Sequence, residues 1–141
     1  MNARITLGHV ALSAADPSAQ AACYRTLFGF DLVCEGTHPL AGEIVLLSGR
    51  PEEDHELALH ARPEARHVGL RGDSERTLRE PYREVRHRGL VVLLAQGSGV
   101  AHSFFFRDPE GNGVEVYWPT DGSSYGVGGG RPLDLSGGTP P

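Results

Sequence analysis

The chain is poor in several features that mark large classes of proteins. It has only two cysteines in 141 residues, which excludes a small domain held together by many disulfides. No apolar run approaches the roughly 20 residues that cross a bilayer, and no basic segment followed by an apolar core opens the chain as in a secretory signal. The sequence therefore predicts a cytoplasmic protein that does not enter membranes.

Charge and missing motifs exclude further classes. The net charge is −5, and the arginines between positions 62 and 88 are interleaved with acidic residues, so the basic stripe of a duplex-binding protein is missing. The sequence has no phosphate-binding glycine loop and no Gly-x-Ser-x-Gly turn of serine hydrolases. Hydrophobic residues make up 39% of the chain, enough to bury a core. We expect a globular protein whose partner is a small molecule and not a nucleic acid.

What the sequence does contain is an internal repeat with a constant offset of 58 residues. The matching pairs are His9-Val10-Ala11-Leu12 with His67-Val68-Gly69-Leu70, Tyr24-Arg25 with Tyr82-Arg83, and Arg50-Pro51-Glu52 with Asp108-Pro109-Glu110. Such a repeat predicts two copies of one supersecondary unit, over residues 4–62 and 63–119. We predict that residues 1–119 form one domain and that residues 120–141, rich in Gly, Ser and Pro, form a tail.

Each copy has the pattern of a β-α-β-β-β unit. In the first copy we expect strands at 5–13, 30–34, 43–47 and 55–60, and a helix that begins after Asp16-Pro17 and ends at Gly29. In the second copy we expect strands at 66–71, 90–95, 102–106 and 114–118 and a helical stretch at 74–88, which Pro81 should break. The prediction is an α+β protein made of two such units in tandem.

The repeat brings metal-ligand residue types to equivalent positions. The first strands carry His9 and His67, and the same offset pairs Leu57 with Glu115 on the last strands. Two histidines and one carboxylate suit a borderline divalent metal, and with open positions they form the facial arrangement of non-haem Fe(II) oxygenases. The alternative is that the histidines are hydrogen-bonded core residues and that Glu115 faces solvent.

Strand alternation extends this interpretation to a third histidine. His55 lies two residues before Leu57 and is expected on the same strand face, about 6.6 Å further along. If Leu57 faces a metal cavity, that distance suits an acid or base better than a ligand. Glu56, Ala58 and His60 would then face the other way.

Three segments resemble the vicinal oxygen chelate superfamily, which includes glyoxalases, extradiol dioxygenases, fosfomycin-modifying transferases and bleomycin-sequestering proteins. The segments are residues 8–13 with 24–25 and 27–30, residues 66–70, and residues 108–118. The resemblance covers about residues 5–118. It implies paired modules that form an open, curved, mixed sheet around a cavity, and a metal held by His9, His67 and Glu115.

Within that superfamily, the extradiol dioxygenases have three ligands and a further histidine that His55 matches. The resemblance therefore implies a catalytic acid/base at His55. The glyoxalase pattern has a fourth ligand where this chain has Leu57, and the dioxygenases usually have a tyrosine at the position of Phe105 and a histidine near Ser98. We predict Leu57 and Phe105 as substrate-binding residues, because an apolar wall is typical of pockets for small aromatic ligands.

The leading hypothesis is a metal-dependent enzyme that resembles extradiol ring-cleavage dioxygenases and acts on a small substrate with vicinal oxygens. Fe(II) is the expected metal, with Mn(II) or Zn(II) as alternatives. A second hypothesis is a binding protein that sequesters an antibiotic or another small molecule without turnover. A third is a metal-dependent lyase or transferase of the glyoxalase type. Homodimerisation is a further hypothesis, since such modules often pair.

Overall fold

The computed structural model describes residues 4–50, 55–97, 101–119 and 131–132. The chain divides into two compact units. The first unit consists of residues 8–68, and the second is built mainly from residues 69–119 with the start of the chain. Each unit follows the expected β-α-β-β-β order, so the predicted pair of tandem units is confirmed.

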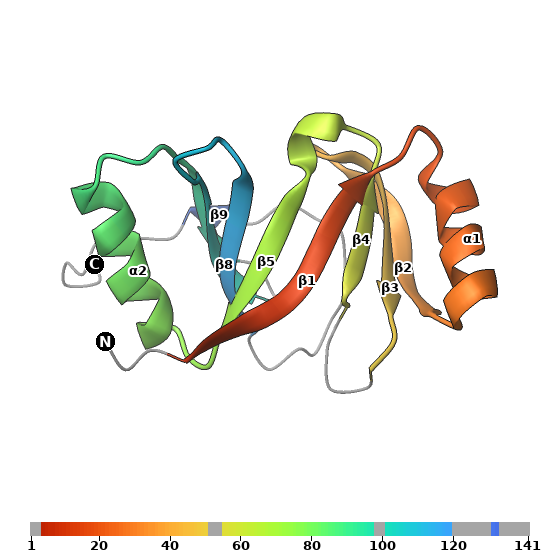
Figure 1. Ribbon diagram of the computed structural model, residues 1–141, viewed down its shortest axis with the longest axis horizontal. Helices are drawn as coiled ribbons and strands as arrows, with labels where there is room; N and C mark the ends of the chain where they lie inside the picture. The colour runs from red at the N-terminus through yellow and green to blue at the C-terminus, as the bar shows by residue number, and fades with distance from the viewer. Residues whose placement is uncertain (1–3, 51–54, 98–100, 120–130, 133–141) are drawn as a thin grey trace. The chain divides into compact units, whose positions relative to one another are not determined.

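The first unit is a four-stranded sheet with one helix (Figure 1). Its strands lie in the order β2-β3-β4-β1, with β1 parallel to β4 and antiparallel pairing elsewhere, which makes the sheet mixed. The elements are β1 (Ile5–Ser13), α1 (Pro17–Phe28), β2 (Asp31–His38), β3 (Gly42–Ser48), β4 (Leu57–His60) and the short 3-10 helix η1 (Pro63–Ala65).

Helix α1 begins and ends where its local sequence predicts. The Asp16 carboxylate accepts a hydrogen bond from the Ala19 N–H at 3.2 Å and so caps the first turn. Pro17 occupies the first turn, where a missing N–H costs nothing. Gly29 ends the helix with φ 76°, and its N–H donates to the Arg25 carbonyl oxygen. The boundaries of α1 are thus encoded within its own segment.

Replacing Asp16 with alanine is expected to lower the free energy of unfolding by about 1 kcal/mol, because the Ala19 N–H loses its acceptor. Urea denaturation followed by circular dichroism measures the change. The matched variant Asp16→Asn keeps a side-chain oxygen at the cap and should retain most of the stability. Equal losses in both variants would contradict the capping role.

Two apolar clusters occupy opposite faces of the first unit's sheet. The cluster on the α1 side contains Ala21, Val45, Leu47, Leu57 and Leu59, and the cluster on the other face contains Ala11, Ile44, Leu46 and Ala58. Because side chains alternate along a strand, His9 shares the face of Ala11 on β1, and His60 shares the face of Ala58 on β4. The two histidines therefore lie on the sheet face that α1 leaves uncovered.

The second unit repeats this plan with strands in the order β5-β8-β7-β6-β9, although the first two residues of β5, His67 and Val68, belong to the first unit. The elements are β5 (His67–Gly72), α2 (Arg76–His87), β6 (Val92–Gly97), β7 (Ala101–Arg107), β8 (Gly113–Pro119) and β9 (Arg131–Pro132). Its core cluster contains Leu78, Tyr82, Val85, Phe104 and Val116. Three of these residues come from α2, which packs on β7 and β8.

Pro81 lies inside α2 without breaking it, so the predicted break is wrong. An interior proline removes one hydrogen bond and costs about 3 kcal/mol. Leu78, Tyr82 and Val85 lie at helical spacing around it, and all three are buried in the core. Burial of such side chains is worth about 1.5–3 kcal/mol each, which offsets the cost of the proline and keeps the helix continuous.

A tight turn between β7 and β8 sets the pairing of these strands. The Asp108 carboxylate accepts hydrogen bonds from the side chain and the N–H of Asn112 and from the N–H of Glu110, and these bonds hold its pKa below the ordinary value. Gly111 has φ 85°, which favours glycine. The resulting register pairs Phe105 with Glu115.

The segment predicted as a tail includes one short strand, because β9 pairs with the last residues of β6. Residues 120–130 and 133–141 of the predicted tail lie outside the described residues. No helix in the described ranges combines the length and the apolar character that a membrane crossing requires.

Candidate metal centre

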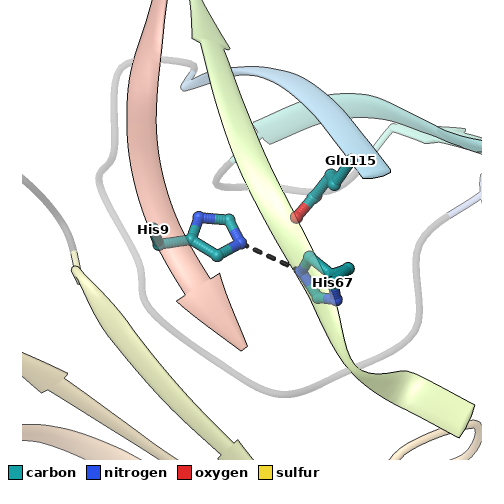
Figure 2. Close-up of side chains that lie close together, drawn as sticks. All are labelled: His9, His67 and Glu115. Atoms are coloured by element: carbon teal, nitrogen blue, oxygen red, sulfur yellow. Dashed lines mark hydrogen bonds between the residues drawn. The ribbon is translucent and has the colours of Figure 1, made fainter. Parts of the chain in front are cut away.

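The two histidines of the repeat meet in the first unit. His9 projects from β1 and is 4% exposed, and His67 is the first residue of β5. Their Nε2 atoms lie 3.0 Å apart and share a hydrogen bond (Figure 2). The ring planes are nearly perpendicular, at 84°. The structure thus brings together the two predicted ligands that belong to this unit.

A backbone carbonyl fixes the orientation of the His67 ring. The Ala65 carbonyl oxygen lies 2.8 Å from His67 Nδ1, and since a carbonyl only accepts, Nδ1 carries the proton. The lone pair is then on Nε2, which accepts the hydrogen bond from the His9 Nε2–H. Metal-binding histidines usually donate their second ring N–H in this way, which fixes the tautomer and increases the basicity of the ligand.

The spacing of the two Nε2 atoms fits a shared metal ion. Metal–imidazole bonds are about 2.0–2.1 Å long, so two nitrogens at right angles around one ion lie about 3.0 Å apart. The observed 3.0 Å matches this separation. Neutral imidazoles also suit iron and zinc. The pair therefore fits two adjacent positions of a divalent metal.

The predicted carboxylate ligand belongs to the second unit. Glu115 lies on β8 between Val114 and Val116, which pack in or against the core beneath α2. By strand alternation, Glu115 and its cross-strand partner Phe105 lie on the face turned away from that core. Phe104, in contrast, is fully buried in the core. The predicted ligand and the predicted wall residue thus share one face of their unit, and Ser98 lies outside the described residues.

The third predicted histidine, His55, lies against His9, with ring centroids 4.5 Å apart. It precedes β4, which begins at Leu57, so the predicted strand start at His55 is wrong. The adjacent Glu56 holds this segment in place: its N–H donates to the Leu47 carbonyl oxygen and its own carbonyl accepts from Val10.

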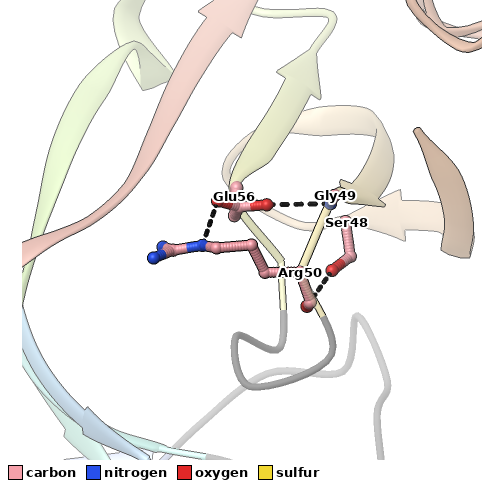
Figure 3. A network of polar contacts seen from close by, with 4 residues as sticks. All are labelled: Ser48, Gly49, Arg50 and Glu56. Atoms are coloured by element: carbon pink, nitrogen blue, oxygen red, sulfur yellow. Dashed lines mark hydrogen bonds and ion pairs between the residues drawn. The ribbon is translucent and has the colours of Figure 1, made fainter. Parts of the chain in front are cut away.

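The Glu56 side chain ties the same segment to the end of β3 (Figure 3). Its carboxylate accepts the Gly49 N–H at 2.8 Å and pairs with the Arg50 guanidinium. The Ser48 hydroxyl donates to the Arg50 carbonyl oxygen at 2.8 Å. These contacts tie Glu56 to the end of β3 and thereby position the adjacent His55.

Leu57 does not take the place predicted for it. It lies in the α1-side core with Ala21, so it faces away from His9. Its surroundings correspond to those of Val116 in the second unit, and Ala58 shares the face that corresponds to that of Glu115. Leu57 is therefore not the structural equivalent of Glu115, and the equivalent position is that of Ala58, one residue further along. The contact with a substrate that was predicted for Leu57 does not agree with this placement.

The same correction brings a fourth histidine to the site, which the sequence interpretation missed. His60 was expected to face away, but its ring centroid lies 5.7 Å from that of His67. Burial, followed by the nearby His67 ring, lowers the pKa of His60 to about 4, so the ring is neutral at pH 7. The alternation of large Leu57 and Leu59 with small Ala58 is the signal that could have indicated this face.

The cysteines do not add a nucleophile to this arrangement. Cys23 is exposed on α1. On β2, burial and the neighbouring Glu35 raise the pKa of the Cys34 thiol, so its reactive thiolate is disfavoured.

Comparison with known families identifies the chain. The family model of the Glyoxalase/Bleomycin resistance protein/Dioxygenase superfamily matches residues 6–116. The chain belongs to this superfamily. The match spans both units, and it confirms the resemblance inferred from the three sequence segments. No curated protein sequence matches the chain.

Several solved structures share the fold of this chain. A 2,2',3-trihydroxybiphenyl 1,2-dioxygenase from Sphingomonas wittichii strain RW1 is 25% identical with a TM-score of 0.65, over 93% of this chain and 45% of that chain. A Mn(II)-bound glyoxalase from Novosphingobium aromaticivorans is 22% identical with a TM-score of 0.68, over 82% and 40%. A methylmalonyl-CoA epimerase from Mycobacterium tuberculosis is 20% identical with a TM-score of 0.62, over 81% and 87%.

These likenesses establish the mixed α+β fold of the superfamily for this chain. The chain spans less than half the length of the dioxygenase and of the glyoxalase. The named relatives differ in reaction, so superfamily membership places the chain among dioxygenases, glyoxalases and epimerases without selecting one of them.

Proposed function

We propose that the chain is a metal-dependent enzyme that resembles extradiol ring-cleavage dioxygenases and acts on a small substrate with vicinal oxygens. The observation that carries the proposal is the His9–His67 pair, with Nε2 atoms 3.0 Å apart and the tautomer of His67 fixed by Ala65. Two imidazole nitrogens at this spacing could occupy adjacent positions around one divalent ion.

The proposed ligands are His9, His67 and Glu115, a set of residue types that could hold a metal ion. Two histidines and one carboxylate are typical of non-haem Fe(II) oxygenases, and Mn(II) or Zn(II) accept the same donors. A divalent metal supplies Lewis acidity that lowers the pKa of bound substrate hydroxyls. Fe(II) is the metal we propose.

The remaining residues act on the substrate itself. His55, held beside His9 by the Glu56 contacts, is the proposed general acid/base that takes or returns a substrate proton. Phe105, on the same face as Glu115, is the proposed apolar wall against an aromatic ring. It carries no hydroxyl, so we propose that the histidines alone provide polar contacts in place of the tyrosine that related dioxygenases usually have.

The test is metal uptake followed by oxygen consumption. Protein stripped with a chelator and reloaded anaerobically with Fe(II), Mn(II) or Zn(II) should take up about one ion per chain. The Fe(II) form should then consume O2 with catechol, as measured with an oxygen electrode. The variant His55→Gln should keep the metal and lose most of the oxygen consumption, since a general acid/base contributes about 10²–10⁴-fold.

The outcomes separate the three functional hypotheses. A protein that takes up none of the three metals would contradict the metal-dependent account and favour a sequestering protein. A loaded protein that converts thiol conjugates of 2-oxoaldehydes without using O2 would contradict the dioxygenase assignment and favour a glyoxalase-type lyase.

A further inference from the structure

His60 is a buried histidine to which the proposed mechanism assigns no role. It ends β4, is 6% exposed and lies with its ring centroid 5.7 Å from that of His67. It shares the sheet face of Ala58, the face on which His9 also projects. The His60 ring therefore lies on the same sheet face as His9 and close to His67, the two proposed ligands in the first unit.

The surroundings of His60 leave one ring nitrogen unsatisfied. Its strand neighbours are Ile44 on β3 and Ser13 on β1. Within the described part of the chain, His60 Nδ1 is buried and has no hydrogen-bond partner. A buried polar atom without a partner is costly, and a bound group that supplies the missing hydrogen bond is one explanation for it.

We propose that His60 recognises a hydroxyl group of the ligand through a hydrogen bond to Nδ1. This inference rests on the proposed function and specifies its substrate class. A hydroxyl both donates and accepts, so it can satisfy the nitrogen in either tautomer. Since the metal that His9 and His67 would hold takes the two vicinal oxygens of the proposed substrate, the group recognised by His60 is a third oxygen. The favoured ligands are therefore small aromatics with three adjacent hydroxyls.

The size of the effect follows from the type of interaction. A hydrogen bond between neutral groups contributes about 0.5–1.5 kcal/mol, or roughly three- to tenfold in affinity. His60 should thus raise the affinity for ligands that carry the third hydroxyl. It should have little effect on the affinity for ligands without that hydroxyl. A residue that merely supports the fold would change the affinity for both ligands together.

The experiment measures binding of catechol and of 1,2,3-trihydroxybenzene to the full chain loaded with Zn(II), which is redox-inert and prevents turnover. Isothermal titration calorimetry should show that the wild type prefers the trihydroxy ligand. In His60→Phe, which keeps the ring volume but not the nitrogen, that preference should fall by about three- to tenfold. The variant His60→Asn places an amide near the position of Nδ1 and should restore part of it.

Zinc content and thermal unfolding are measured on the same samples. Wild-type protein without bound zinc overturns the proposed metal site together with the role of His60. A zinc-loaded His60→Phe variant that binds both ligands as the wild type does, or that loses affinity for both equally, overturns the role of His60 alone. If His60→Phe unfolds, His60→Leu, which also lacks a ring nitrogen, takes its place in the same comparison.

Discussion

Replacing His67 with alanine is expected to lower the affinity for Fe(II) or Zn(II) by more than 100-fold. Loss of an outer hydrogen bond to a ligand costs about 10–100-fold in metal affinity, and this substitution removes the ligand itself. His67 Nε2 points at His9 Nε2 at 3.0 Å and its orientation is fixed by Ala65, so no other nitrogen of this ring replaces it. Competition with a chromogenic chelator measures the affinity.

The matched control is His87→Ala, which removes an exposed histidine at the end of α2. It should bind metal as the wild type does. His67 is half-buried at the start of β5, so both variants should remain folded, as judged by circular dichroism. Wild-type affinity in folded His67→Ala would remove this residue from the metal site.

The second large effect is expected in the core of the second unit. Phe104 is 0% exposed and its ring packs edge-to-face on Tyr82 at 5.3 Å. Truncating such a residue to alanine costs about 3–5 kcal/mol, a large part of the roughly 5–15 kcal/mol that stabilises a domain. Urea denaturation should show Phe104→Ala unfolding at a much lower midpoint than the wild type.

The neighbouring Phe105→Ala is the matched control, because its side chain lies on the opposite face of β7. It should cost much less stability while weakening the binding of aromatic ligands. If the two variants lose similar stability, the assignment of faces in β7 and β8 is wrong. The same result would also remove the proposed shared face of Phe105 and Glu115.

Local signals predicted much of this fold. Strand β1 has the predicted bounds, and α1 begins after Asp16 and ends before Gly29, because strand propensity and helix caps act within a few residues. Helix α2 was harder to predict, since Pro81 is tolerated only through the burial of its neighbours in the core. That compensation comes from tertiary packing and leaves no mark on the segment itself.

The candidate site was predictable in its residue types and less so in its geometry. The repeat indicated His9 and His67, and the structure places them in hydrogen-bond contact. Constant spacing failed for Leu57, because this side chain packs in the α1-side core, whereas Glu115 lies on the face turned away from the core of its own unit. This error of one residue assigned the side chains of β4 to the wrong faces of the sheet. His60 was therefore predicted to face away from the site.

The carbonyl of Ala65 also limits the side-chain entropy that the His9–His67 pair would lose on binding an ion. Strands β1 and β5 fix the two backbones, and the Ala65 oxygen restricts rotation of the His67 ring. Side chains that are already confined lose little rotational freedom on association, and affinity rises when that entropy loss is small. The three-residue helix η1 is therefore expected to pre-organise the proposed metal site through the Ala65 carbonyl oxygen, although it supplies no ligand atom to the ion.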